Sequence, residues 1–153
     1  MKIKYKKITP NARIKGYATP GAAAFDIYPN GVFQELGMSP EFVDIAISTG
    51  LSFEIPEGYA MLVYSRSGHA FNFGINLING VGVIDSDYRG ELKIMLRIPR
   101  RHFEEVGFMA KLADKPVAQG IITPILQVDF EEATDLSETL RGAGGFGSTN
   151  HSN

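Results

Sequence analysis

Alternation of apolar and polar residues dominates this chain. In several short segments every second side chain is Val, Ile, Leu, Met, Phe or Tyr. These segments lie at residues 1–5, 43–47, 51–55, 59–63 and 92–98. Because successive side chains of a strand point to opposite faces, each segment predicts a half-buried β-strand.

Turn signals separate the predicted strands. They are Thr19-Pro20-Gly21, Pro29-Asn30-Gly31, Pro56-Glu57-Gly58 and Asn79-Gly80. Frequent short strands between such turns predict an all-β sandwich or barrel. We expect at most one short helix, near residues 65–71, and a charged loop over residues 100–115 with Phe103 and Phe108 as its anchors.

Composition and charge narrow the class of protein. The 153 residues carry 15 Lys and Arg against 17 Asp and Glu, and 44% of them are hydrophobic. These values fit one globular domain and exclude a globally basic nucleic-acid binder. The absence of cysteine excludes disulfides, and the scattered histidines lack metal-ligand spacing. Without a signal peptide or a membrane-spanning run, we expect a cytoplasmic protein (host cytoplasm if viral) with no nucleic-acid or membrane partner.

The segment with the strongest indication of a functional site is NGVGVIDSDYRGELK, residues 79–93. It predicts a hairpin with Asp85 and Tyr88 at or near its turn. Asp85 directly follows an apolar run, where partial shielding would suit a general base acting on water. Asp-Ser-Asp is also ordinary turn chemistry, so the segment alone does not separate a catalytic site from a plain hairpin.

Three further places carry weaker signals. Ser65-Arg66-Ser67-Gly68 stands at a predicted strand-to-helix junction, which suits phosphate oxygens but equally suits a capped helix start. Asp26 follows a turn of small residues and can hold water on a magnesium ion, or be a surface carboxylate. Gln119 is an amide inside an apolar strand and needs hydrogen-bond partners. We expect His69 to be packed or solvated rather than to act as a base.

The tail reads RGAGGFGSTN, residues 141–150. A glycine-rich tail is typical of a disordered linker. Linkers, however, rarely need an arginine and a phenylalanine, so the tail has to be interpreted together with the rest of the chain.

Five segments, in order along the chain, resemble the five motifs of the trimeric dUTP pyrophosphatase (dUTPase) family. They are PGAAAFD, SRSG, NGVGVIDSDYRG, KPVAQ and RGAGGFGSTN. The resemblance implies a distorted jelly-roll or β-clip-like domain over residues 1–130. It also implies a connector and flexible arm over residues 131–153 that closes an active site. The expected activity is hydrolysis of dUTP to dUMP and pyrophosphate with Mg²⁺, in a homotrimer with shared active sites.

The resemblance also implies roles for single residues. Asp85 is expected to be the general base, and Asp26 to hold Mg²⁺ through water. The implied substrate-binding residues are Arg66, Ser67, Gly68 and Gln119 for phosphate, Asn79, Val83 and Ile84 for uracil, Tyr88 for deoxyribose, Lys93 near the substrate, and Arg141, Phe146, Gly147 and Ser148 in the arm.

Departures from the family pattern leave alternatives open. The usual Gly-Asp-Arg run before the fourth motif is Ala113-Asp114-Lys115, followed by an extra Pro116. A dCTP deaminase-like enzyme would share the fold, but it needs an acid–base glutamate that has no evident equivalent here. A non-catalytic nucleotide-binding regulatory protein is a second alternative, against which Asp85 and Asp26 count. A purely structural jelly-roll module would leave the order of the motifs unexplained.

Overall fold

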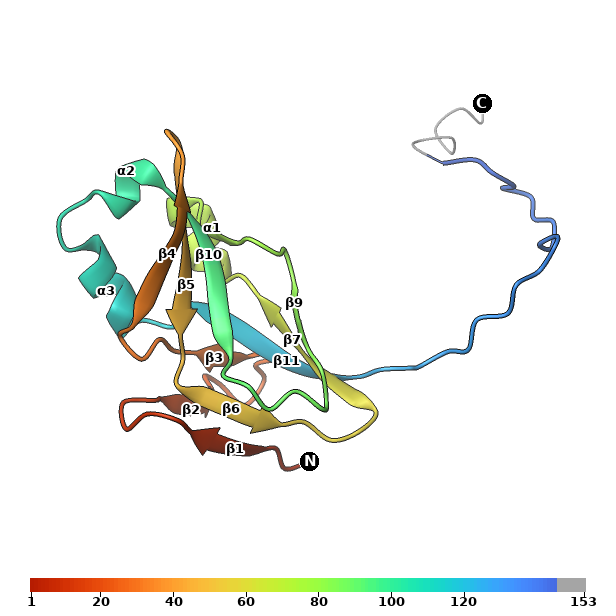
Figure 1. The fold of residues 1–153 in the computed structure, drawn as a ribbon, viewed down its shortest axis with the longest axis horizontal. Coiled ribbons are helices and arrows are strands. Elements are labelled where there is room, and N and C mark those ends of the chain that lie inside the picture. Colours follow the sequence, from red (N-terminus) through yellow and green to blue (C-terminus); the bar gives the residue numbers. More distant parts are fainter. Residues whose placement is uncertain (146–153) are drawn as a thin grey trace.

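The computed structural model describes residues 1–145 of the chain as a β-rich body with an extended C-terminal segment (Figure 1). The strands are β1 (Lys4–Lys7), β2 (Ile14–Tyr17), β3 (Phe25–Ile27), β4 (Phe33–Met38), β5 (Phe42–Ser48), β6 (Leu51–Glu54), β7 (Tyr59–Tyr64), β8 (Asn76–Leu77), β9 (Gly82–Ile84), β10 (Lys93–Pro99) and β11 (Ala118–Pro124). The helices are α1 (Ser67–Phe73), α2 (Arg100–Phe103) and α3 (Phe108–Asp114).

Antiparallel pairing arranges these strands in three sheets. One sheet has the order β4-β5-β10-β8, a second has β2-β3-β11-β7-β9, and β1 pairs with β6. Side chains from both larger sheets meet in one apolar core. The expected all-β class is therefore confirmed.

The alternating pattern of the sequence decides which strand faces are buried. In β5 and β10 every second residue is buried while its neighbours are exposed or half-buried. The inward side chains are Val43, Ile45, Ile47, Ile94, Leu96 and Ile98, each at most 3% exposed. Burial of a side chain of this size stabilises the fold by roughly 1.5–3 kcal/mol.

The number of helices differs from the expectation of at most one. Helix α1 forms where the single helical turn was predicted, but residues 100–115 form α2 and α3 instead of a loop. Phe108 and Leu112, one helical turn apart, are both buried against the core. The many charged residues of the surrounding segment, 100–115, obscured this apolar spacing in the sequence. Within residues 1–145, none of the helices is long and apolar enough to cross a membrane.

The predicted hairpin over residues 79–93 is wrong. Strand β9 pairs with β7, whereas β10 pairs with β5 and β8, so the segment crosses from one sheet to the other. Eight residues, Asp85–Leu92, separate the two strands, which is longer than the turns that close tight hairpins. The N–H of Leu92 is bound by the carbonyl of Leu51 at the end of this crossing.

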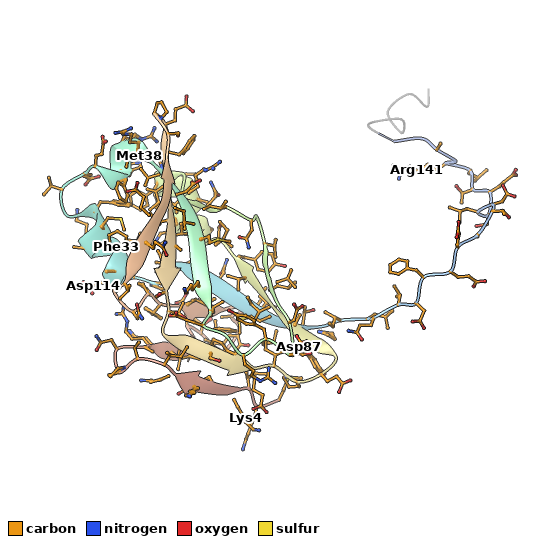
Figure 2. All side chains as sticks on the ribbon, in the orientation of Figure 1. Lys4, Phe33, Met38, Asp87, Asp114 and Arg141 are labelled. Atoms are coloured by element: carbon orange, nitrogen blue, oxygen red, sulfur yellow. The ribbon has the colours of Figure 1, made fainter. Side chains whose placement is uncertain are left out.

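The C-terminal segment leaves the body of the subunit after β11. Residues 125–145 contain no helix or strand and run away from the sheets (Figures 1 and 2). Leu126 and Phe130 are 88% and 96% exposed. The division into a domain over residues 1–130 and an arm over 131–153 stays a prediction.

Candidate active site

The register of three strands brings the predicted phosphate-binding residues together. Asp26 on β3 lies opposite Gln119 on β11, and Gln119 lies opposite Tyr64 at the end of β7. Arg66 follows Tyr64 as the residue that precedes α1. Segments far apart in the sequence thus place a carboxylate, an amide and a guanidinium at one end of the central strands of the five-stranded sheet.

Hydrogen bonds hold these side chains in place. Arg66 Nε lies 3.3 Å from Asp26 Oδ1, with both side chains partly shielded. Arg66 Nη1 donates to the carbonyl of Pro116 at 3.3 Å. Gln119 Nε2 donates to the carbonyl of Ser65 at 2.9 Å. The guanidinium and the amide are therefore oriented before any anion binds.

Gly120, which the sequence reasoning missed, and Ser65 of the predicted phosphate segment support this group. A Cβ on Gly120 would lie 2.6 Å from the ring of Phe25, so only glycine lets β3 and β11 approach here. Ser65 Oγ accepts a hydrogen bond from the N–H of Leu77 at 2.9 Å and ties the turn to β8. A glycine next to a polar residue inside a strand was the signal for the first of them.

Ser67 and Gly68 form the first turn of α1 and are exposed. The N–H groups of a helix's first turn have no partner within the helix. They lie next to Arg66, where they can bind phosphate oxygens together with its guanidinium.

A second group of predicted residues lines a separate cavity of about 160 Å³. Asn79, Val83, Ile84 and Lys93 all contribute to its wall. The other lining residues are Val63, Leu77, Gly82, Leu92, Ile94 and Met95. Apolar walls with one amide and one ammonium suit a flat, partly polar ring better than a phosphate chain.

Asp85 lies just outside this cavity, at the end of β9. Its side chain is exposed, so the expected partial shielding is not present in the structure. It lines a wider polar cleft of about 720 Å³ together with Glu57, Asp87 and Arg89. Arg89 Nη1 donates to the carbonyl of Ser86 at 2.6 Å and stiffens the turn after Asp85.

Tyr88 is held by its own turn. Its backbone N–H donates to the carbonyl of Asp85 at 3.3 Å, and its hydroxyl donates to the carbonyl of Glu91 at 3.0 Å. The missing side chain of Gly90 leaves room for the ring. The ring of Tyr88 is therefore fixed and half-exposed.

One copy of the chain does not unite the two groups within the described residues. Ile84 pairs with Met61, and Arg66 is five positions further along the chain, roughly 17 Å away in extended backbone. Because the strands are antiparallel, Asp85 lies beyond Ile84 in the opposite direction. Arg141 is on the extended arm, away from Asp87 in Figure 2, with its Nε bound to the carbonyl of Gly144. Phe146, Gly147 and Ser148 lie outside the described residues.

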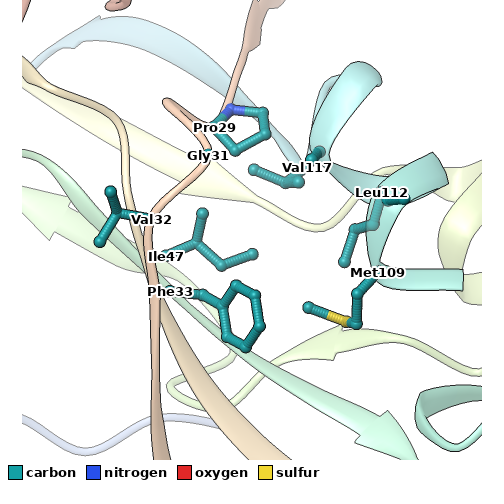
Figure 3. Close-up of a pocket in the computed structure, with 10 residues that line it drawn as sticks. Pro29, Gly31, Val32, Phe33, Ile47, Met109, Leu112 and Val117 are labelled. Carbon is teal, nitrogen blue, oxygen red and sulfur yellow. The ribbon is translucent and has the colours of Figure 1, made fainter. Parts of the chain in front are cut away.

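An apolar groove elsewhere on the chain is a different feature. It lies between β4 and α3 (Figure 3), and its volume is about 230 Å³. Phe33, Ile47, Met109 and Leu112 line it, and no charged or hydrogen-bonding side chain does. Since a triphosphate needs cationic and N–H donors, this groove is not its binding site.

His69 is packed, as expected, and is only 7% exposed. Burial lowers the pKa of its imidazole below the usual 6.5, and the positive charges of Arg66 and Lys115 act in the same direction. The nearby backbone of Val117 acts in the opposite direction and raises this pKa. The folded protein therefore holds His69 in its neutral form near neutral pH.

The lowered pKa predicts a loss of stability on acidification. As the pH falls below the unfolded pKa of about 6.5, the unfolded chain binds a proton at His69 before the folded chain does. We expect the melting temperature of the wild type to fall more steeply between pH 7 and pH 5 than that of His69→Gln. Thermal unfolding across this range measures both slopes, and equal slopes would contradict the prediction.

Comparisons with known proteins find relatives in sequence and in fold. A family model described as dUTPase matches residues 10–150. A Nautilia profundicola protein named deoxyuridine 5'-triphosphate nucleotidohydrolase is 42% identical over 149 residues, 97% of this chain and 99% of that protein. The structure of Staphylococcus bacteriophage 80alpha dUTPase with dUPNHPP has a TM-score of 0.75 at 23% identity, covering 96% and 97% of the two chains. A phage phi11 dUTPase variant with a structural Mg(II) ion has a TM-score of 0.71 at 20% identity, covering 90% and 100%.

Proposed function

This chain belongs to the dUTPase family, and from this premise we propose how it hydrolyses dUTP to dUMP and pyrophosphate. The strand register that unites Asp26, Gln119 and Arg66 is the observation that carries the proposal. These side chains and the first turn of α1 bind the phosphates. The negative charge of the phosphates repels an attacking nucleophile, and the guanidinium of Arg66 offsets this charge. The same guanidinium stabilises the charge that shifts toward the leaving pyrophosphate as the bond breaks.

Magnesium fits this group of residues. Within residues 1–145, no three His, Asp or Glu side chains are placed to hold a metal ion on their own. Mg²⁺ keeps several waters and is often held by one carboxylate together with substrate phosphates. Asp26 would hold the ion through water. When bound, the ion would offset part of the negative charge of the phosphates.

Asp85 is the general base in this proposal. Water attacks the α-phosphorus, its proton passes to the Asp85 carboxylate, and the bond to the leaving pyrophosphate breaks. The turn stiffened by Arg89 supports this role, because a base must be aimed at its water.

The cavity beside β9 provides specificity for the base and the sugar. Asn79 and the backbone of Val83 and Ile84 bind the edge of uracil, and Tyr88 packs under deoxyribose. Lys93 lines the same cavity and would lie close to the substrate. The fixed ring of Tyr88 supports the exclusion of a 2′-hydroxyl.

A homotrimer with shared sites would bring the separated groups together. The distance of roughly 17 Å between the strand positions of Ile84 and Arg66 favours a site built from different copies. The exposed apolar side chains of Leu126 and Phe130 favour a second copy as the surface that covers the extended segment. Arg141, Phe146, Gly147 and Ser148 would then close over a neighbour's nucleotide.

The function is tested with a panel of nucleoside triphosphates and identification of the products. We expect dUMP and pyrophosphate from dUTP, and at least ~10-fold lower kcat/KM for dCTP, because each buried polar group left unpaired costs about 1–3 kcal/mol. UTP should be rejected similarly by Tyr88. Hydrolysis of dCTP or UTP at the rate of dUTP would contradict the assignment of this cavity, and release of ammonia from dCTP would favour a deaminase.

A further inference from the structure

The segment that crosses from β9 to β10 is fastened at its far end to the corner between β5 and β6, residues 49–52. Three hydrogen bonds join the two: the N–H of Leu92 to the carbonyl of Leu51 at 2.8 Å, Thr49 Oγ1 to the carbonyl of Leu92 at 2.6 Å, and Ser52 Oγ to the carbonyl of Arg89 at 2.7 Å. Thr49 and Leu51 are both buried. The corner is therefore a rigid support for the segment that carries Asp85 and Tyr88.

Glu91 is bound to this corner through its side chain. Its Oε1 accepts the N–H of Gly50 at 2.8 Å. Gly50 is buried and has a φ of 68°, and a Cβ at this position would collide with Thr9 Oγ1. The backbone of Gly50 is thus a fixed anchor, and its buried N–H needs an acceptor. The carboxylate of Glu91 is that acceptor, and the bond fixes the position of Glu91 itself.

The backbone of Glu91 holds the ring of Tyr88. The Tyr88 hydroxyl donates to the carbonyl of Glu91 at 3.0 Å, and the ring lies so close to Gly90 that a Cβ there would overlap it. Tyr88 is 45% exposed, so packing alone does not fix its ring. A path of hydrogen bonds therefore runs from Gly50 through the side chain and the carbonyl of Glu91 to the phenol.

We propose that Glu91 is a positioning residue for sugar selectivity, whose side chain, anchored on Gly50, keeps the ring of Tyr88 where it excludes a 2′-hydroxyl. The inference rests on the proposed packing of Tyr88 under deoxyribose. Glu91 does not touch the nucleotide itself. UTP differs from dUTP only by the 2′-hydroxyl. A ring that is free to move gives this hydroxyl room, so the enzyme loses discrimination between the two nucleotides more than it loses turnover of dUTP.

The test compares Glu91→Leu, which has a similar size but no acceptor, with Glu91→Gln, which keeps an oxygen for the N–H of Gly50. The measured quantity is the ratio of kcat/KM for dUTP to kcat/KM for UTP. For Glu91→Leu we expect this ratio to fall about 10-fold, and for Glu91→Gln to stay within about 3-fold of wild type. Discrimination against dCTP should not change in either variant, because it is assigned to Asn79 and the backbone of β9.

Tyr88→Phe tests the same path from its other end. This variant keeps the ring and removes the hydroxyl, so the ratio should fall about as far as in Glu91→Leu. The double variant should be no less selective than either single variant, because both changes break one path of contacts. Losses of selectivity that multiply in the double variant would overturn the proposal.

Glu54→Ala is the matched control. It removes a carboxylate of β6 that binds Lys4 at the surface, and its ratio should equal that of the wild type. A merely structural role of Glu91 would lower the turnover of dUTP and UTP equally, and that result would overturn the proposal. An unchanged ratio in Glu91→Leu, a Glu91→Gln variant as unselective as Glu91→Leu, or an equal loss of discrimination against dCTP would overturn it as well.

Tyr88→Ala distinguishes failure of the inference from failure of its premise. If this variant lowers the ratio for dUTP over UTP while Glu91→Leu does not, only the role of Glu91 is wrong. If Tyr88→Ala leaves the ratio unchanged, the assignment of Tyr88 to deoxyribose is wrong and the role of Glu91 falls with it.

Discussion

Asp85→Asn is expected to lower kcat for dUTP by ~10²–10⁴-fold while nucleotide affinity stays within a few-fold of wild type. Asparagine keeps the shape and most hydrogen bonds of aspartate but cannot accept the proton of the attacking water. The exposed position of Asp85 in the subunit means that its replacement removes no packing from the core. Steady-state turnover, together with the affinity for a non-hydrolysable dUTP analogue, measures the two quantities separately.

Asp87→Asn is the matched control for this substitution. Asp87 lines the same polar cleft two positions along the chain, and we assign it no part in the reaction. Its variant should keep turnover near that of the wild type. Turnover of Asp85→Asn within a few-fold of wild type would show that another group accepts the proton.

Truncation after Leu140 is expected to lower kcat/KM by at least ~10²-fold. The loss combines a charge-assisted contact of Arg141, worth about 1.5–3 kcal/mol, with ring stacking of Phe146, worth about 1–3 kcal/mol. Closure also excludes water and strengthens interactions with the developing charge.

The truncated protein should keep the fold and the assembly of the full chain. The described hydrogen bonds of Arg141 and Gly142 stay within the arm, so their removal leaves the sheets untouched. Light scattering should give the mass of a trimer for both proteins, and their melting temperatures should agree. Phe146→Ala should be milder, because it keeps the charge of Arg141. Full activity after truncation would identify the tail as a plain linker.

Much of the fold was predictable because local patterns specify it. The alternation in β5 and β10 is regular, and one face of each strand is buried, so the pattern and the structure coincide. The turn glycines Gly31, Gly58 and Gly80 have positive φ angles, which glycine adopts without strain. Such signals need no knowledge of distant partners.

The pairing of the strands, the formation of helix α3 and the arrangement of the site depended on distant parts of the chain. Strand β9 has three residues, too few to specify whether β7 or β10 becomes its partner. In α3, charged neighbours obscured the spacing of Phe108 and Leu112. For the site, the motifs predicted the residue types, but the separation of Asp85 from Arg66 follows from strand register, which no local pattern contains.

That separation has a genetic consequence. Suppose that each site takes its base and its arginine from different chains of the assembly. The effect of one altered chain on each site then depends on which chains lie next to it. A chain without the Asp85 carboxylate and a chain without the Arg66 guanidinium, each inactive alone, can together build one intact site. In a cell that makes both, the two alleles would complement each other, and the harm done by either would depend on its share of the mixture.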